Sequence, residues 1–341
     1  MFSVFQRFYR RLATSLVVLL GVSFLIFAIA RIIPGDPARI ALGPNATPQA
    51  VEQLRENLHL NDPFISQYGY FIRDLMQGDF GVSLYTNRSV TTDIKVFLPA
   101  TLELVLVAGL MMVLIGLPLG RLAARYAGTW IDHVIRLVTI MAVSAPSFVW
   151  AVIFMLLFAY FVPLFPVAGR ISEELSVDPK TGFMLLDSLL DGNLKAFFDS
   201  VWHLILPAFA LALSGIGQAA RLVRSNMVET YKRPYIEMAK SYGIGERFIA
   251  RRLAFKPSLI PSLTILGLDF AAMLGNAFLI EAVYAWPGLS RYGVEVIMRK
   301  DLNAIVGTVI IIAAMFLIMN LIVDLLVTAL NPRIRLSGRE K

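Results

Sequence analysis

The sequence is poor in the residues that most often carry chemistry. Its 341 residues include no cysteine and only three histidines, which stand far apart at His59, His133 and His203. The chain therefore has no disulfide, no thiolate ligand for a metal and no histidine spacing of the HExxH kind. No glycine is followed by lysine, so the GxxxxGK[ST] loop that cradles ATP phosphates is absent. We expect no catalytic residues, no metal site and no cofactor bound by this chain.

Charged residues are also scarce. They make up 16% of the chain, whereas 57% of the residues are hydrophobic, which is unlike the composition of a soluble domain. The apolar residues come in six blocks, each near the roughly 20 residues that a helix needs to cross the hydrocarbon layer. The sequence therefore predicts an all-α polytopic membrane protein. Its six predicted spans cover residues 12–33, 100–121, 134–161, 201–221, 258–283 and 304–330.

The basic residues predict how these spans are oriented. Of the 31 Lys and Arg residues, 19 lie in residues 1–11, 121–136, 221–256 and 333–341, and such an excess marks cytoplasmic connections. Both termini are therefore predicted to be cytoplasmic. The same bias accounts for the net charge of +7, so no nucleic-acid partner is needed to explain it. Residues 28–30 resemble a signal-peptidase site, but the apolar block before them exceeds the roughly 7–15 residues of a signal core, so we interpret it as an uncleaved span.

The connections divide the chain into four parts. Residues 1–33 form the cytoplasmic N-terminus and first span, and residues 34–99 form a sizeable outer, periplasmic segment. Within that segment Thr47 and Pro48 are typical of a helix start, and turns are predicted at Asn61-Asp62-Pro63 and at residues 78–81. Residues 100–330 hold spans 2–6 with a hydrophilic loop at about 222–257. Residues 331–341 form a cytoplasmic tail.

The hydrophilic loop contains a predicted helix. In YIEMAKSYGIGERFIARRLAFK (residues 235–256), Tyr235, Met238, Ala239 and Tyr242 recur at the spacing of one helical face. Pro234 suits the first turn, and Gly243 stands where a left-handed residue ends a helix. A second basic turn at residues 246–252 then leads back to the membrane. The loop is therefore predicted to be a helix, a glycine corner and a second helix, projecting into the cytoplasm.

Two interpretations of this helix remain open from the residues alone. It could lie flat on anionic headgroups, with Lys and Arg facing the phosphates. Alternatively it could enter a groove of a partner protein, because a small Ala239 between two tyrosines would let the backbones approach.

Polar residues inside the spans are costly in lipid and usually face the interior of the bundle. Asp269 and Asn276 are seven residues apart, on one face of the fifth span, and Glu281 lies near its outer end. They are candidates for the lining of a polar passage. The alternative is that they, like Glu103 in the second span, only form hydrogen bonds or ion pairs between helices.

Several motifs together resemble one known family. The run Glu237-Met238-Ala239, followed after three residues by Gly243, is similar to the EAA loop of ABC-importer permeases, with Met238 in place of the usual Ala. Other stretches resemble the dipeptide, oligopeptide and nickel branch of that family, in order along nearly the whole chain. They are PGDPA (34–38), LHLNDP (58–63), GDFGVS (78–83), LPATLEL (98–104), APSFVWAV (145–152), ARLVRSNM (220–227), EAVYAWPGLSRY (281–292), NLIVDLL (320–326) and NPRIR (331–335).

The resemblance implies a function. The chain would be the permease subunit of an ATP-driven importer in the bacterial inner membrane, forming half of a path for peptides. Its implied partners are a homologous second permease, two ATPase subunits that use ATP and Mg²⁺, and a periplasmic binding protein. Tyr235, Glu237, Met238, Ala239, Tyr242 and Gly243 would form the coupling helix that docks on an ATPase. Glutathione, nickel chelates and opines stay open as substrates, as does an ATP-independent secondary transporter, whereas an enzyme lacks any nucleophile–base pair.

Overall fold

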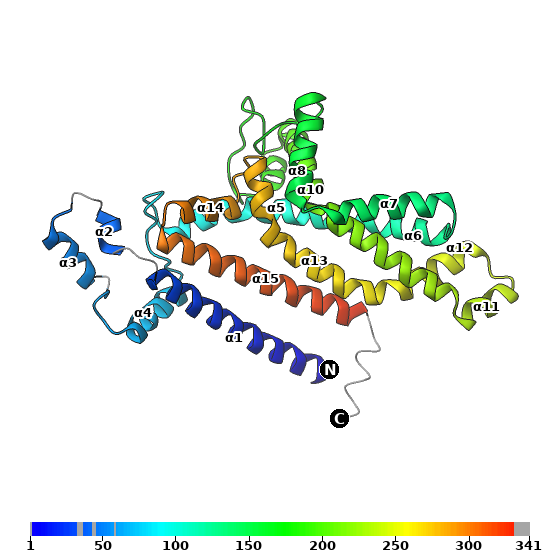
Figure 1. The fold of residues 1–341 in the computed structure, drawn as a ribbon, viewed down its shortest axis with the longest axis horizontal. Coiled ribbons are helices and arrows are strands. Elements are labelled where there is room, and N and C mark those ends of the chain that lie inside the picture. The colour runs from blue at the N-terminus through cyan, green and yellow to red at the C-terminus, as the bar shows by residue number, and fades with distance from the viewer. Residues whose placement is uncertain (1, 33–36, 43–45, 58, 331–341) are drawn as a thin grey trace.

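The computed structural model describes residues 2–32, 37–42, 46–57 and 59–330 (Figure 1). The predicted tail at residues 331–341, Ile33 and most of the PGDPA motif lie outside the described residues. Within those residues, α- and π-helices dominate, and the extended pairing consists of one isolated bridge between Val82 and Ser89. The prediction of an all-α polytopic membrane protein is confirmed.

Five continuous helical stretches among the described residues are long and apolar enough to cross a membrane, and a bent pair of helices supplies a sixth candidate span. All five stretches begin before their predicted bounds, because polar turns continue the helix outside the apolar block. The five stretches are α1 (Phe2–Ile32), then α5 (Val90–Met111) continued by η1 (Met112–Gly116) and α6 (Leu117–Arg125), then α10 (Leu194–Tyr231), then η3 (Ile249–Phe255) continued by α13 (Lys256–Val283), and α15 (Leu302–Leu330).

The third predicted span, residues 134–161, is not one continuous helix. It consists of α7 (Trp130–Ser144), α8 (Ser147–Met155) and the π-helical η2 (Leu156–Phe161), and the chain bends by 103° between α7 and α8. Pro146 explains the break, because it has no N–H to donate and it forces the residue before it out of the helical region. Ala145 accordingly has φ −117° and ψ 146°. In Figure 1, α8 stands nearly at right angles to the rest of the bundle.

The outer segment holds the short helices α2 (Pro37–Leu42), α3 (Pro48–Asn57) and α4 (Phe64–Met76). The predicted helix start is confirmed, since the Thr47 hydroxyl accepts a hydrogen bond from the Ala50 N–H at 3.3 Å. α5 begins at Val90 and includes Pro99, so the last ten residues of the predicted segment are already helical. α1 packs beside α4 through aromatic contacts such as Phe27 on Phe71.

A loop after α4 fastens the outer segment to the bundle. Asp301, which is fully buried between α14 (Leu289–Met298) and α15, accepts hydrogen bonds from the Ser83 hydroxyl at 2.6 Å and from the Tyr85 N–H at 3.0 Å. The Tyr85 hydroxyl in turn donates to Glu295 at 2.7 Å, which raises the pKa of Tyr85. Through Ser83, the GDFGVS stretch therefore links the outer segment to α14 and α15.

A second loop, between η2 and α10, packs on the bundle. Arg170 of this loop pairs with Glu103 of α5 at 2.6 Å, and both side chains are nearly buried. Farther along, α9 (Met184–Leu190) carries Asp187. Burial would raise the pKa of Asp187, but hydrogen bonds from Thr181, Gly182 and Lys180 outweigh it and hold that pKa below its ordinary value. The contact between Glu103 and Arg170 is thus an ion pair, which the sequence analysis gave as one possible role for Glu103.

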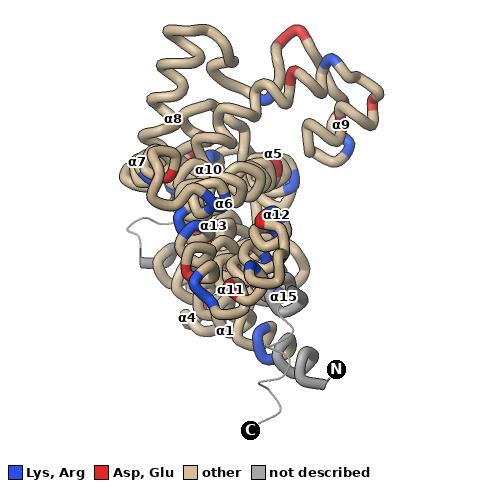
Figure 2. The backbone as a smooth tube through the Cα atoms, turned by 90° about the vertical axis from the view of Figure 1, so that its right-hand side faces the viewer, with Lys and Arg blue, Asp and Glu red and all other residues tan. Residues whose placement is uncertain are grey.

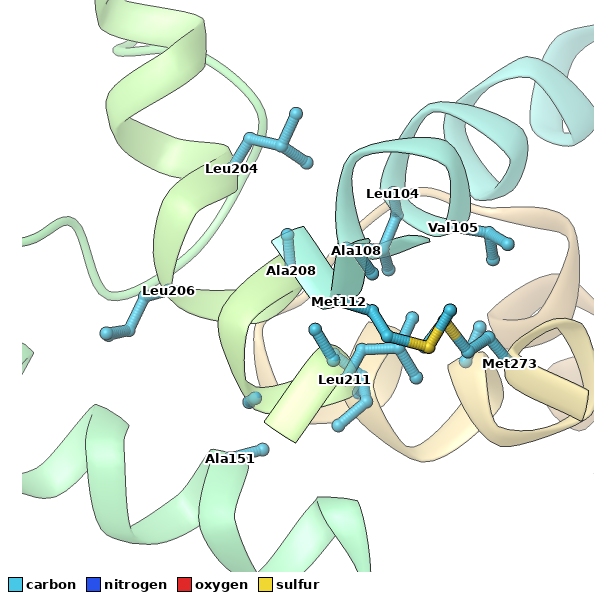
Figure 3. Close-up of a cluster of buried hydrophobic side chains, with 14 of the residues drawn as sticks. Leu104, Val105, Ala108, Met112, Ala151, Leu204, Leu206, Ala208, Leu211 and Met273 are labelled. Carbon is cyan, nitrogen blue, oxygen red and sulfur yellow. The ribbon is translucent and has the colours of Figure 1, made fainter. Parts of the chain in front are cut away.

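α10 is the central helix, with α5, α6, α7, α8 and α13 packed around it. Its buried face is rich in small residues, and its apolar neighbours include Leu104 and Met112 of the α5–η1 stretch and Met273 of α13 (Figure 3). A Cβ added at Gly217 would lie 2.8 Å from the Thr139 carbonyl, and one added at Gly116 would lie 2.7 Å from the Ala219 Cβ. Small residues let membrane helices approach in this way, so α10 is held tightly on several sides.

Candidate functional site

The predicted hydrophilic loop forms a knob at one end of the bundle, opposite the outer segment (Figure 1). We define the knob as α11 (Pro234–Ser241), the corner at residues 242–245, α12 (Glu246–Phe248) and η3. α10 leads into it and α13 leads out of it, so both of its ends are anchored in long helices. Figure 2 looks onto this end of the molecule, where Lys and Arg recur along the chain.

The two ends of α11 follow the predicted signals. Pro234 occupies the first turn, after Arg233 in an extended conformation. At the other end Gly243 has φ +74°. Its N–H bonds to the Lys240 carbonyl at 2.9 Å, and the Ile244 N–H bonds to the Ala239 carbonyl at 3.1 Å. This pair of hydrogen bonds is a Schellman motif, which needs the left-handed conformation at Gly243. The predicted left-handed conformation of Gly243 at the end of α11 is confirmed.

The inner face of α11 packs on the knob itself. Ile236 and Ala239 are buried against Ile249 of η3. The partner-groove interpretation placed Ala239 on a face offered to a partner, whereas in this structure its side chain is 5% exposed and packs inside the knob. Ala239 lies at the contact between α11 and η3, because a small residue is needed where two helices meet at close range. The sequence alone could not tell an internal close contact from an external one.

The outer face of α11 carries the remaining predicted residues. Tyr235, Glu237, Met238 and Tyr242 are all exposed, with Tyr242 at 77%. The Tyr235 hydroxyl donates to the Leu253 carbonyl of η3 at 3.1 Å, which holds that ring along the edge of the knob. We call these four residues the outer face of the knob.

The base of the knob is fastened to the bundle. Ala250 and Ala254 of η3 are buried against Ala124 of α6 and Met227 of α10. Arg121 lies 5.8 Å from the centre of the Phe255 ring, within the range of a cation–π contact. The knob is therefore packed on α6 and α10 and is continuous with α10 and α13. These contacts favour movement of the knob together with those helices.

An ion pair that the sequence analysis missed secures the same end. Arg224 of α10 binds Asp132 of α7 through two hydrogen bonds, at 2.5 and 2.6 Å, and the Gly128 N–H donates to the same carboxylate at 3.0 Å. Asp132 is 1% exposed and Arg224 is 23% exposed. The ARLVRSNM motif contains Arg224, but its partner lies 92 positions away, so no local signal connects the two. The pair fixes the hairpin of α6 and α7 to α10.

The three residues proposed for a membrane passage have different surroundings. Asp269 accepts a hydrogen bond from Gln218 of α10 at 3.2 Å, and its Oδ2 is buried with no hydrogen-bond partner among the described residues. Asn276 is exposed and lines a cavity of about 470 Å³ beside the α7–α8 break. The remaining lining comes from residues 143–148, Ser214 of α10, and Phe278 and Leu279 of α13.

Glu281 does not line an open passage in this structure. It is fully buried, accepts hydrogen bonds from the Thr101 hydroxyl at 2.5 Å and the Arg291 N–H at 2.8 Å, and so holds the start of α14 against α5. It lies near the end of α13 that is farther from the knob, and its contacts are structural here. Buried carboxylates need such partners, because an unpaired one is costly. Within the described residues, no three His, Asp or Glu side chains are placed to hold a metal ion.

Comparison with known proteins settles the family. The family described as the inner-membrane component of binding-protein-dependent transport systems matches residues 116–336, and its companion for the N-terminal part of such membrane components matches residues 4–105. This chain belongs to that permease family. The membership predicted from the motifs is confirmed, and the permease is a multi-pass membrane transport subunit.

Similar proteins align with this permease from end to end. A probable D,D-dipeptide transport system permease protein, DdpB, of Escherichia coli K12 is 40% identical over 326 residues, which is 95% of each chain. The dipeptide permease DppB of Alkalihalophilus pseudofirmus is 36% identical, covering 96% of this chain and 98% of its own length. The di/tripeptide permease DppB of Pseudomonas aeruginosa is also 36% identical, covering 96% and 97%.

The ion pair between Asp132 and Arg224 gives a stability prediction. Arg224→Met leaves the Asp132 carboxylate buried and unpaired, which costs about 3–5 kcal/mol. The double variant Asp132→Leu/Arg224→Met removes both charges and should regain most of the lost stability. Thermal unfolding of the purified permease in detergent measures both. The control is Arg233→Met, which breaks the exposed Arg233–Glu229 pair and should change stability by less than about 1 kcal/mol. A double variant as unstable as Arg224→Met would contradict this account.

Proposed function

We propose that this permease forms half of the membrane path of an ATP-driven importer for short peptides, which an external binding protein delivers. The observation that carries the proposal is the end-to-end match to three permeases whose names specify dipeptide or di/tripeptide transport. A match over at least 95% of this chain includes the outer segment, the bundle and the knob together. The relatives therefore share every part that a binding protein, a substrate and an ATPase would contact.

Energy for this import comes, in the proposal, from separate ATPase subunits that bind ATP and Mg²⁺. The absence of a GxxxxGK[ST] loop in the chain supports this division of labour. A second, homologous permease completes the path, and two ATPases complete the assembly. The outer face of the knob docks in a groove of one ATPase. Its exposed Tyr242 and Met238 supply apolar contact, and Glu237 supplies a charge that a basic partner would match.

The orientation follows from the same proposal. The knob lies on the cytoplasmic side, and the outer segment faces the binding protein. α1 starts toward the knob end and runs toward the outer segment (Figure 1), which supports a cytoplasmic N-terminus. The excess of Lys and Arg in the knob and in residues 121–136 supports the same direction.

Reconstitution tests the proposed function directly. The permease, co-expressed with its second permease and ATPases and placed in proteoliposomes, should import a radiolabelled dipeptide only when ATP and the loaded binding protein are both present. Dipeptides of L- and D-residues should be compared, with glutathione and a nickel chelate as alternative cargoes. Import that needs no ATP would indicate a secondary transporter. Import of only the alternative cargoes would overturn the assignment to peptides.

The role of the knob gives a second prediction in the same system. Gly243→Val places a β-branched residue at φ +74°, where backbone strain costs about 1–3 kcal/mol, so α11 should tilt or unwind. Gly245→Val is the matched control, because Gly245 has φ −61° and open space around it. We expect Gly243→Val to insert normally but to lose peptide-stimulated ATP hydrolysis, and Gly245→Val to retain it. Wild-type stimulation in Gly243→Val would show that the knob is not the coupling element.

A further inference from the structure

The cavity lies beside the α7–α8 break, where the backbone is not helical. Membrane proteins rarely leave such backbone uncovered. The break at Ala145–Pro146 falls inside a predicted span, and Pro146 is exposed. Irregular backbone at membrane depth is stable only where protein buries it or where it borders a water-filled space. Here the bordering space is the cavity of about 470 Å³. Asn276 of α13 also lines this cavity and is seven residues from the end of that helix, or about 10 Å at 1.5 Å per residue.

The lining of this cavity mixes polar and apolar residues and carries no charge. Asn276, Ser147 and Ser214 supply an amide and two hydroxyls from three different helices, and none of the lining residues is charged. The amide of Asn276 can both donate and accept hydrogen bonds. Phe148 and Phe278 supply apolar surface beside these groups. A neutral ligand part that carries both an N–H and a C=O, next to variable apolar groups, matches this lining.

The other polar groups of the span suit this role less well. Glu281 is fully buried and engaged with Thr101 and Arg291. Asp269 is held by Gln218, its remaining oxygen is enclosed, and it does not line the cavity. Asn276 differs from both because its side chain is exposed and borders open volume. The size of the cavity falls within the roughly 300–1,000 Å³ of small-ligand sites.

We propose that this cavity is a transit site that binds the main-chain amide of a peptide, with Asn276 as its principal hydrogen-bonding group. The inference rests on the proposed peptide function and adds a location and a mode of recognition. A main-chain amide is common to all peptides, so a neutral site of this kind accepts different side chains. Selection among peptides then occurs before the membrane, and this site only has to bind weakly enough to release its cargo.

A single-cysteine experiment tests whether peptide occupies the cavity. Because the chain contains no cysteine, Ser147→Cys provides a unique thiol in the cavity with little change in size. Leu114→Cys, exposed on η1 and outside the cavity lining, is the control. The reconstituted complex, trapped with ATP and vanadate, is exposed to a thiol reagent with either empty or dipeptide-loaded binding protein. We expect peptide to slow the labelling of residue 147 several-fold and to leave residue 114 unchanged.

The other outcomes overturn the proposal. Equal labelling of residue 147 with and without peptide would show that peptide does not reach the cavity. No labelling in either state would show that the second permease covers it. Import by the unmodified complex is measured in parallel. If that import fails, the proposed function fails, whereas normal import without protection of residue 147 contradicts only the transit site.

Substitution of Asn276 tests the mode of recognition. Asn276→Leu keeps the approximate size but removes the hydrogen bonds, and we expect the dipeptide import rate to fall about fivefold to tenfold, as for one or two lost hydrogen bonds. Asn276→Gln retains the amide and should recover most of that loss. Equal import by Asn276→Leu and the unmodified permease, or an equal loss in both variants, would contradict amide recognition.

Discussion

The close packing of α10 is the constraint on which the rest of the structure depends. Inside a bilayer, apolar burial contributes little to helix association, so contact between backbones and small side chains must hold the bundle together. Gly217 and Ala219 of α10 let α7 and η1 approach within van der Waals distance. The buried Asp132–Arg224 pair then fixes α7 at the knob end, where lipid packing gives way to polar surroundings. α6, α7 and α10 therefore form one unit, and the knob continues that unit out of the membrane.

Under the proposed function, this arrangement lets a small surface helix act on a distant passage. α11 is fixed internally by Ile236 and Ala239 and is joined at its base to α6 and α10. A displacement of its outer face thus carries α10 and α13 with it, instead of bending a loop. α13 is the helix that carries Asn276 at the cavity and Asp269 farther toward the knob. In the proposed importer, closure of the ATPases is converted into a movement of the passage wall by rigid contacts.

Local signals in the sequence predicted much of this, and long-range contacts explain the remainder. Apolar blocks located the spans, and the positions of Pro234 and Gly243 correctly predicted the start and end of α11 because capping depends on neighbouring residues. The pattern could not show that Pro146 bends the third span by 103°, since prolines in membrane helices produce anything from a slight kink to a full break. The burial of Ala239 and the engagement of Glu281 depend on residues brought together only by the fold. The spacing of Asp269 and Asn276 predicted a shared lining, but only Asn276 borders the cavity, which needs α7 and α8 to define it.

The central claim is that the knob and the α6–α7–α10 unit move as one body. It is tested most directly by the distance between two spin labels within this permease, one at Phe248 on the knob and one at Leu137 on α7, both exposed. The cysteine-free chain allows both labels to be placed by cysteine substitution. In the assembled transporter, the account predicts the same distance distribution without nucleotide and in the ATP-bound state that responds to loaded binding protein. A shift of that distribution between the two states would show that the knob moves independently and would contradict the account.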